Sequence, residues 1–472
     1  MDIERDSVGL VRREFLAVLL AGFGNELLPL TSNYGDEPCP KALLPVANRP
    51  MIDFALSWIE QSGIHDVLLI CPSIHRPTIY HHIHSETAVS LSTLRIDLQT
   101  YDESQDTSVG TCTILRHFSN RITDDFVLVP CDFITPQSLP LSLLLDKFRT
   151  DAISDGSIAT TCWFADHKPE KGAFPDEWGP HLQPSPIVWD EATGTLLHID
   201  TPDDQDRNAE ELELRMALLS RFVLFLTILD KVPHLIPDLD PVTNHTSQAL
   251  ALKHTTMSKD TSTFNEPFNG TISTKDTSLS APPSPTIGDQ SLGGSNSLRV
   301  GIVLHRAEAG FATRVNTIPR FLEINRRFLS QVTYALPTEP KDRSLIDQKA
   351  QISSDTVIGG STQVSERTTI KKSVIGRHCV IGKMVKIVGC VLLDHCVIED
   401  GAKLEGCILG KNTKIGTKAE LSRSVTQAGY EVEAGETFRG EKLDVSDWTA
   451  VVEDGEEDGE DEEETSDEGD DA

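Results

Sequence analysis

The chain has 472 residues, and its 42 Lys and Arg against 73 Asp and Glu give a formal net charge of −31. That length suffices for two or three domains with substantial hydrophobic cores. The charge argues against a general nucleic-acid or anionic-membrane binder, whose surface should be basic. Because 14 of the acidic residues lie within residues 453–472, where there is no Lys or Arg, a local basic patch elsewhere stays compatible with the composition. We therefore predict no membrane partner and identify no direct nucleic-acid site.

An α/β domain is predicted for residues 15–239, after an N-terminal extension of residues 1–14. Short apolar runs there alternate with helical patterns: strands over 15–20, 66–70 and 126–129, and helices over 50–61 and 141–148. This alternation predicts parallel strands joined by right-handed crossovers, in a sheet covered on both faces. Ser62 and Gly63 are expected to end the first helix.

The nine cysteines form an odd set without a Cys-x-x-Cys pair. Neither a disulfide framework nor a zinc knuckle fits that spacing. We therefore predict reduced, mostly packed thiols, a cytosolic location and no metal held by cysteine.

Residues 240–297 differ in composition, because 20 of these 58 residues are Ser or Thr and residues 281–285 read Ala-Pro-Pro-Ser-Pro. Such a stretch cannot bury enough apolar area to offset the entropy of ordering it, so we predict a disordered insert. Ordered sequence is expected to resume in residues 298–345, as a return segment and connector.

A six-residue repeat marks residues 346–448, and several of its apolar residues are followed by Gly. The first apolar positions are Ile352, Ile358, Val364 and Ile370. This period predicts a parallel β-helix whose stacked coils share one apolar core; an ordinary antiparallel β domain, with a period of two, is the alternative. Cys390 and Cys396 then lie one flat face apart as packing residues. Residues 449–472 form an acidic tail, for which charge repulsion predicts disorder.

The most informative motif follows the first strand. Residues 20–31 read Leu-Ala-Gly-Phe-Gly-Asn-Glu-Leu-Leu-Pro-Leu-Thr, and residues 40–50 read Pro-Lys-Ala-Leu-Leu-Pro-Val-Ala-Asn-Arg-Pro. A Gly-rich loop after a strand lets backbone N–H groups approach phosphates closely, because Gly has no Cβ. A lone Gly-x-Gly is a weak signal, but its combination with the Pro-Lys segment is specific.

This combination closely resembles the signature of the sugar-nucleotide pyrophosphorylases, a nucleotidyltransferase family with a Rossmann-like fold. The resemblance implies an α/β Rossmann-like nucleotidyltransferase-type domain followed by a left-handed parallel β-helix of hexapeptide repeats. Gly22 and Gly24 match the glycines that cradle the nucleoside triphosphate, and Lys41 matches the phosphate-binding lysine. Asp132, at the end of Val-Leu-Val-Pro-Cys-Asp, matches the aspartate that holds Mg²⁺.

One departure from the family pattern changes the chemistry. The family has Gly-Thr-Arg-Leu where this chain has Gly24-Asn25-Glu26-Leu27, so a carboxylate replaces a phosphate-binding guanidinium. An acidic insertion at Asp36-Glu37 follows, and a second metal carboxylate is not found in its usual setting. We therefore predict a vestigial nucleotide loop (Gly22, Gly24, Glu26, Lys41), a vestigial metal aspartate (Asp132), and neither catalytic residues nor a cofactor.

These departures resemble one branch of the family, the gamma-type subunits of the guanine-nucleotide exchange factor for eukaryotic translation initiation factor two, in a fungal-looking form. The stretches that carry this resemblance are residues 45–52, 212–219, 314–319, 321–326 and 373–376. It implies a non-catalytic scaffold that pairs directly with an epsilon subunit, assembles with alpha, beta and delta subunits, and acts on initiation factor two. After Phe222 the resemblance fades, as if a strand–helix unit were missing or altered.

Two other functions stay in view. One is an active sugar-1-phosphate nucleotidyltransferase that makes a nucleotide sugar. The other is an epsilon-type subunit, which should carry a helical exchange domain after the β-helix. Only 24 residues, 14 of them acidic, follow Trp448 here, so this interpretation is disfavoured. The tract His81-His82-Ile83-His84 could bind a metal, but a solvated helix end is expected instead.

Overall fold

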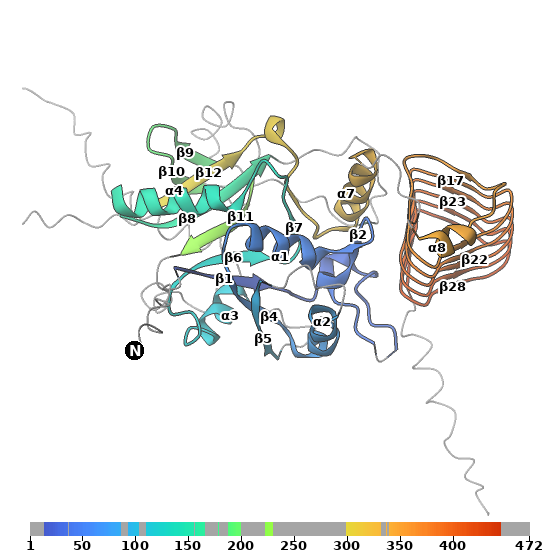
Figure 1. The fold of residues 1–472 in the computed structure, drawn as a ribbon, viewed down its shortest axis with the longest axis horizontal. Coiled ribbons are helices and arrows are strands. Elements are labelled where there is room, and N and C mark those ends of the chain that lie inside the picture. Colours follow the sequence, from blue (N-terminus) through green and yellow to red (C-terminus); the bar gives the residue numbers. More distant parts are fainter. Residues whose placement is uncertain are drawn as a thin grey trace, which may run out of the picture. The chain divides into compact units, whose positions relative to one another are not determined.

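The computed structural model describes residues 14–35, 37–85, 93–102, 110–154, 156–165, 178, 187–199, 222–229, 299–331, 337 and 339–444. They divide into two compact units, one drawn from residues 1–27 and 35–325 and the other from residues 28–34 and 326–472 (Figure 1). The predicted insert at 240–297, the acidic tail at 449–472 and residues 1–13 of the extension lie outside the described residues. None of the described helices is both long enough and apolar enough to cross a bilayer.

A nine-stranded sheet forms the centre of the first unit, in the order β5-β4-β1-β6-β11-β8-β12-β10-β9. Its strands are β1 (Phe15–Leu20), β4 (Asp66–Pro72), β5 (Arg95–Tyr101), β6 (Asp125–Pro130), β8 (Ser157–Ala165), β9 (Ile187–Asp190), β10 (Thr195–Ile199), β11 (Phe222–Leu229) and β12 (Arg299–His305). β1 pairs in parallel with β4 and β6 on its two sides. The chain thus runs outward from β1 in both directions, which creates a topological switch point at the carboxyl ends of β1 and β6.

Helices cover both faces of this sheet. They are α1 (Met51–Gln61), α2 (Arg76–Ile83) and α4 (Leu141–Ser154) on one face and α3 (Thr111–His117) on the other. A further helix, α7 (Ile318–Gln331), follows β12 in the chain. Alternate residues of β1 point to opposite faces: Ala17 and Leu19 pack with α1 and α4, whereas Leu16 and Val18 pack with α3. Successive residues of β1 are apolar, so the strand is buried on both of its faces. With the amphipathic helices it forms one apolar layer on each side of the sheet, as the sequence predicts.

The predicted elements are confirmed, with one correction. The predicted helix over 50–61 is α1, which ends at Gln61 before Ser62 and Gly63. The three predicted strands pair in parallel as expected, but the sheet is not parallel throughout. β11 runs antiparallel to both β6 and β8, and β10 runs antiparallel to β12 and β9. β11 fills the sheet where the resemblance fades, so a strand is present at that point of the domain.

Short elements between the strands and helices complete the first unit. They are η1 (Asn25–Leu27), η2 (Lys41–Leu43), β2 (Pro45–Val46), β3 (Arg49–Pro50), η3 (Ser73–His75), β7 (Phe133–Ile134), η9 (Ala307–Ala309) and β13 (Thr313–Arg314). β13 pairs antiparallel with β7, directly after β6. This pairing brings a late segment of the chain beside the end of β6.

Stacked coils of short parallel strands form the second unit, after α8 (Pro340–Ser344). One sheet contains β14 (Gln351–Ile352), β17 (Thr369–Lys371), β20 (Lys386–Val388), β23 (Lys403–Glu405), β26 (Glu420–Ser422) and β29 (Thr437–Arg439). The second contains β15 (Val357–Ile358), β18 (Val374–Ile375), β21 (Val391–Leu392), β24 (Ile408–Leu409), β27 (Val425–Thr426) and β30 (Lys442–Leu443). The third contains β16 (Gln363–Val364), β19 (Val380–Ile381), β22 (Val397–Ile398), β25 (Lys414–Ile415) and β28 (Glu431–Val432). The predicted parallel β-helix is confirmed, and the antiparallel alternative is wrong.

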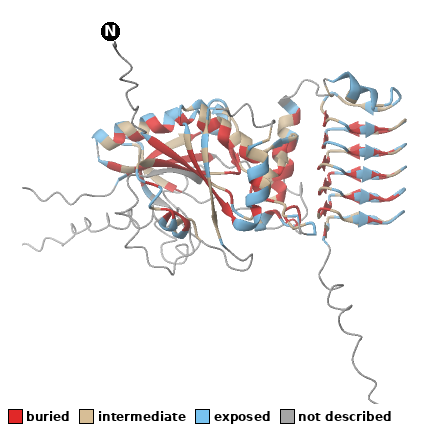
Figure 2. Cartoon of the chain, turned by 60° about the horizontal axis from the view of Figure 1, so that its bottom comes forward, coloured by how far each residue is buried: buried red, intermediate tan, exposed pale blue. Residues whose placement is uncertain are grey.

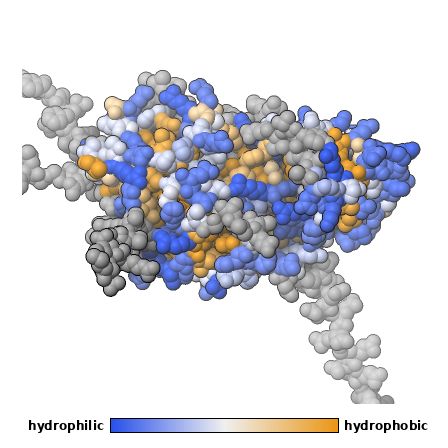
Figure 3. Space-filling model, viewed as in Figure 1, coloured by the Kyte–Doolittle hydropathy of each residue, from blue (hydrophilic) through white to orange (hydrophobic). Residues whose placement is uncertain are grey.

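The geometry of a coil explains the slips in the six-residue repeat. Strands on successive faces begin at Val357, Gln363, Thr369 and Val374, which gives steps of six, six and five residues. Residues one coil apart stack in register, as do Ile370, Ile387 and Leu404. Buried and more exposed positions alternate along the strands of the first and third sheets (Figure 2), whereas both residues of β15, β18, β21, β24 and β27 are buried. The β-helix is mostly hydrophilic on the face seen in Figure 3.

Side chains inside the coils are apolar or small. Cys379 and Cys396 occupy equivalent positions in successive coils, and so do Cys390 and Cys407; all four are at most 1% exposed. Each thiol points at a backbone carbonyl of the coil, such as Cys396 Sγ at Gly410 O, 3.2 Å away. The prediction that Cys390 and Cys396 are packing residues is therefore confirmed.

Candidate functional site

The loop after β1 begins at the switch point of the sheet. The ladder of β1 continues past its last residue, because Ala21 N donates to Ile70 O and Cys131 N donates to Leu20 O. The chain then turns through Gly22 and Gly24 into η1, where Leu27 N donates to Gly24 O at 2.8 Å. The glycine loop and the end of β6 therefore lie at the same edge of the sheet, as expected for a ligand site in such a fold.

Gly24 is required at its position for two reasons. Its φ of +84° lies in the left-handed region, which side chains rarely adopt. A Cβ added here would lie 2.7 Å from Cβ of Lys41. Gly22, by contrast, is exposed, and an added Cβ would meet nothing within 4 Å. The structure thus brings Gly24 and Lys41 into direct contact, whereas Gly22 faces open space.

The turn that carries Lys41 is held from two sides. Pro40 precedes η2, and Leu43 N donates to Pro40 O, so Lys41 sits at the start of a tight turn. Further along, β2 and β3 form a hairpin whose central residues Ala47 and Asn48 have φ values of 48° and 66°. Ala47 N donates to the side-chain Oδ1 of Asn325 at 2.8 Å. The fully buried Asn325 of α7 therefore fixes the position of the segment that follows Lys41.

Asp132 lies immediately beyond β6, with its side chain 1% exposed. Its oxygens meet two cations: Lys41 Nζ is 2.5 Å from Oδ2, Arg314 Nε is 2.9 Å from Oδ1, and Arg314 Nη2 is 3.2 Å from Oδ2. Arg314 comes from β13, and the next residue, Val315, donates its backbone N–H to Asp132 O. We call Lys41, Asp132 and Arg314 the ion triad.

The electrostatics of the triad keep Asp132 ionised. Burial by itself raises the pKa of this carboxyl group, but the charges of Arg314 and Lys41 and their hydrogen bonds outweigh burial and hold the pKa well below its usual range. The neighbouring thiol of Cys131 responds in the opposite way, because burial raises its pKa to about 12. The triad is therefore a carboxylate with two protein cations, and its net charge is positive.

Arg314 is the member of the site that sequence reasoning missed. It stood within a stretch that carried the family resemblance, but 182 residues separate it from Asp132 and no motif linked the two. Conversely, Glu26 is exposed and is not among the described residues that contact Asp132. Of the acidic insertion, Asp36 lies outside the described residues and Glu37 is exposed.

A buried histidine lies beside the same loop. His75, at the end of η3, is 2% exposed and its ring stands edge-on to that of Phe23, with centroids 5.1 Å apart. Its Nδ1 has no hydrogen-bond partner among the described residues. Burial lowers the pKa of His75 to about 4, so the ring is neutral at physiological pH.

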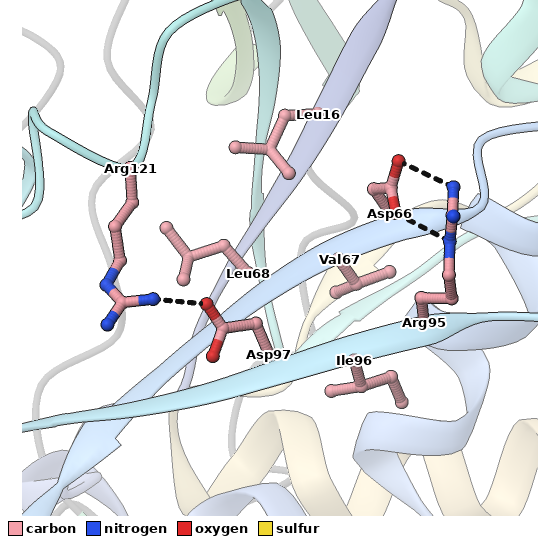
Figure 4. A pocket seen from close by; sticks show the side chains of 8 residues that line it. All are labelled: Leu16, Asp66, Val67, Leu68, Arg95, Ile96, Asp97 and Arg121. Carbon is pink, nitrogen blue, oxygen red and sulfur yellow. Dashed lines mark hydrogen bonds and ion pairs between the residues drawn. The ribbon is translucent and has the colours of Figure 1, made fainter. Parts of the chain in front are cut away.

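Two other candidate sites carry no comparable chemistry. His82 of the histidine tract pairs with Asp53 at 2.8 Å, and no group of three or more potential metal ligands occurs within the described ranges. A hollow of about 310 Å³ lies near the amino ends of β4 and β5 (Figure 4). Its charged residues already pair, Arg95 with Asp66 and Arg121 with Asp97. No predicted site residue lines this hollow.

Comparisons with known proteins define the class of protein first. Residues 16–172 match the family model "Nucleotidyl transferase", and residues 340–438 match the model "EIF2B subunit epsilon LbH domain", a left-handed β-helix. The chain thus combines a nucleotidyltransferase domain with a β-helix of the hexapeptide type. Both parts of the predicted fold class are confirmed.

The relatives then point to one kind of protein with this domain pair. The chain is 29% identical to "Translation initiation factor eIF2B subunit gamma" of Schizosaccharomyces pombe, over 91% of this chain and 90% of that protein. It is 25% identical to the gamma subunit of Dictyostelium discoideum, over 79% and 89%. The epsilon subunit of S. pombe is 27% identical over 26% of this chain and 17% of its own length. Across nearly its whole length, the chain is similar to eIF2B gamma subunits.

Proposed function

We propose that this chain is a non-catalytic scaffold and regulatory subunit of a guanine-nucleotide exchange factor for translation initiation factor two. In this proposal it pairs with an epsilon-type subunit in the cytosol, and alpha-, beta- and delta-type subunits complete the assembly. The observation that carries the proposal is the similarity to gamma subunits across both domains and nearly the full length. The presence of Glu26 where the family places a phosphate-binding arginine supports a non-catalytic role.

The proposal is tested by isolating the chain with its partners. An affinity-tagged chain, purified from its native cell and analysed by mass spectrometry, should retain an epsilon-type subunit at comparable molar amount. Adding the purified assembly to initiation factor two loaded with GDP should accelerate GDP release. Recovery of the chain without any such subunit, from cells in which the tagged chain supports growth, would contradict the proposal.

The second candidate is an active nucleotidyltransferase, favoured by the contact between Gly24 and Lys41 and by the position of Asp132 beyond β6. It requires release of pyrophosphate from a nucleoside triphosphate and a sugar 1-phosphate. We expect no pyrophosphate release, either from the wild-type chain or from Glu26→Arg, because catalysis needs all the phosphate- and metal-binding charges placed together.

A second assay measures GDP release by the assembly that contains Glu26→Arg, and its rate should stay near that of the wild type. A tenfold loss with the assembly intact would place the loop in the exchange reaction.

A further inference from the structure

The family resemblance assigns Mg²⁺ to Asp132, and the residues around this carboxylate do not fit that ion. Mg²⁺ requires a near-octahedral shell of oxygen ligands and usually takes more than one carboxylate or phosphate group. Here both oxygens of Asp132 already accept hydrogen bonds from protein cations. Within the described ranges, Asp132 belongs to no group of three or more His, Cys, Asp or Glu side chains that could hold a metal ion.

The two cations are held in place by the fold. The stem of Lys41 packs against Gly24, where a Cβ would collide with it, and its side chain is 7% exposed. Arg314 is held by the pairing of β13 with β7 and by the backbone bond from Val315 N to Asp132 O. Its guanidinium approaches Asp132 in the fork geometry that suits a carboxylate. A divalent ion at Asp132 would have to displace these contacts and approach two positive charges.

We propose that the guanidinium of Arg314 takes the place of the metal ion, so that Asp132 is the anchor of a closed internal ion triad and not a metal ligand. The triad ties together three segments that are distant in sequence: η2, the turn after β6, and β13. This inference rests only on contacts inside the first unit, so it does not depend on the exchange-factor assignment.

The first experiment measures divalent-ion binding to the full-length chain, with Mn²⁺ as the spectroscopic probe. The electron paramagnetic resonance signal of free Mn²⁺ should be unchanged by the wild-type chain, and the unfolding midpoint should be the same in MgCl₂ and in EDTA at equal ionic strength. Saturable Mn²⁺ binding by the wild type that disappears in Asp132→Asn would overturn the proposal.

The second experiment tests whether Arg314 is the group that keeps a metal ion away from Asp132. Arg314→Asp removes one cation from Asp132 and places a second carboxylate within its reach. We expect this variant to bind Mn²⁺ at least tenfold more tightly than the wild type, and its unfolding midpoint to rise when Mn²⁺ is added. A folded variant that gains no affinity would show that Arg314 is not what excludes the metal.

A double-mutant cycle covers the case in which that variant does not fold. Asp132→Asn and Arg314→Gln should each lower the unfolding midpoint, and the double variant should lower it by clearly less than the sum, because the partners lose a shared interaction. The matched control is the cycle of Asp97→Asn and Arg121→Gln, an exposed pair for which the effects should nearly add. Additive effects at Asp132 and Arg314 would contradict the triad.

Discussion

Gly24 shows how one residue sets the geometry of the candidate site. It combines a left-handed backbone with a close approach to the side chain of Lys41. Because Lys41 reaches Asp132, a change at Gly24 acts on the ion triad through the lysine stem.

We predict that Gly24→Ala destabilises the chain by about 2–4 kcal/mol, from the cost of a left-handed alanine and the collision with Lys41. Gly22→Ala is the matched control, because an added Cβ there meets nothing within 4 Å. Urea denaturation of both variants measures the difference. Equal midpoints for the two alanines would contradict the structural role given to Gly24.

The buried ring of His75 should make the stability of the folded chain depend on pH. Its pKa is lowered from the usual value near 6.5 to about 4 in the folded chain, so between these values the unfolded chain binds more protons. Stability therefore falls as the pH drops from about 6.5 towards 4.

We predict that His75→Gln removes this contribution of the ring, which is worth about 3 kcal/mol over that range. The measurement is the free energy of unfolding at a series of pH values, with the exposed His81→Gln as control. A His75 variant whose pH profile matches the wild type would mean that burial does not perturb this ring.

At the scale of elements, the β-helix depends on stacked side chains more than on any single strand. Its strands are only two or three residues long, so their stability comes from neighbours one coil above and below. Ile387 illustrates this, because it is fully buried between Ile370 and Leu404 in register.

We predict that Ile387→Ala costs about 2–5 kcal/mol, the usual range for an emptied aliphatic site in a core. Amide hydrogen exchange should rise most in β17 and β23, the strands on either side. Lys386→Ala, at the exposed neighbouring position, should change neither quantity appreciably. Loss of protection confined to β20 would contradict stacking as the source of stability.

At the scale of the whole molecule, the two units have separate cores. The clusters around β1 contain residues of the first unit only, and the cluster inside the coils contains residues of the second. Chains with more than one core commonly depart from two-state unfolding.

We predict two transitions in scanning calorimetry of the full-length chain. Gly24→Ala should lower the midpoint of one transition, and Ile387→Ala should lower that of the other. A single transition that both variants shift equally would show that the units unfold as one.

Local patterns explain which features the sequence predicts. The apolar run of β1, the amphipathic spacing of α1 and the six-residue repeat each depend on neighbours within a few residues, and all three are confirmed. The choice of Lys41 and Asp132 as candidate site residues also follows, because the motif resembles that of a family with a known fold. The ion pair between them was not predicted. The antiparallel orientation of β11 cannot be predicted from the sequence pattern, because parallel and antiparallel strands can have the same apolar run.

The sequence by itself determined the two-domain organisation and the position of the glycine loop, because these depend on periodicity and on a contiguous motif. It also identified Lys41 and Asp132 as candidate site residues, through short motifs that resemble those of a known family. Only the tertiary structure decided that Arg314 completes the site, since its contact with Asp132 spans 182 residues and arises from the pairing of β13 with β7. It also decided the charge state of the site. The balance between burial and neighbouring cations at Asp132 depends on distances that no linear pattern contains.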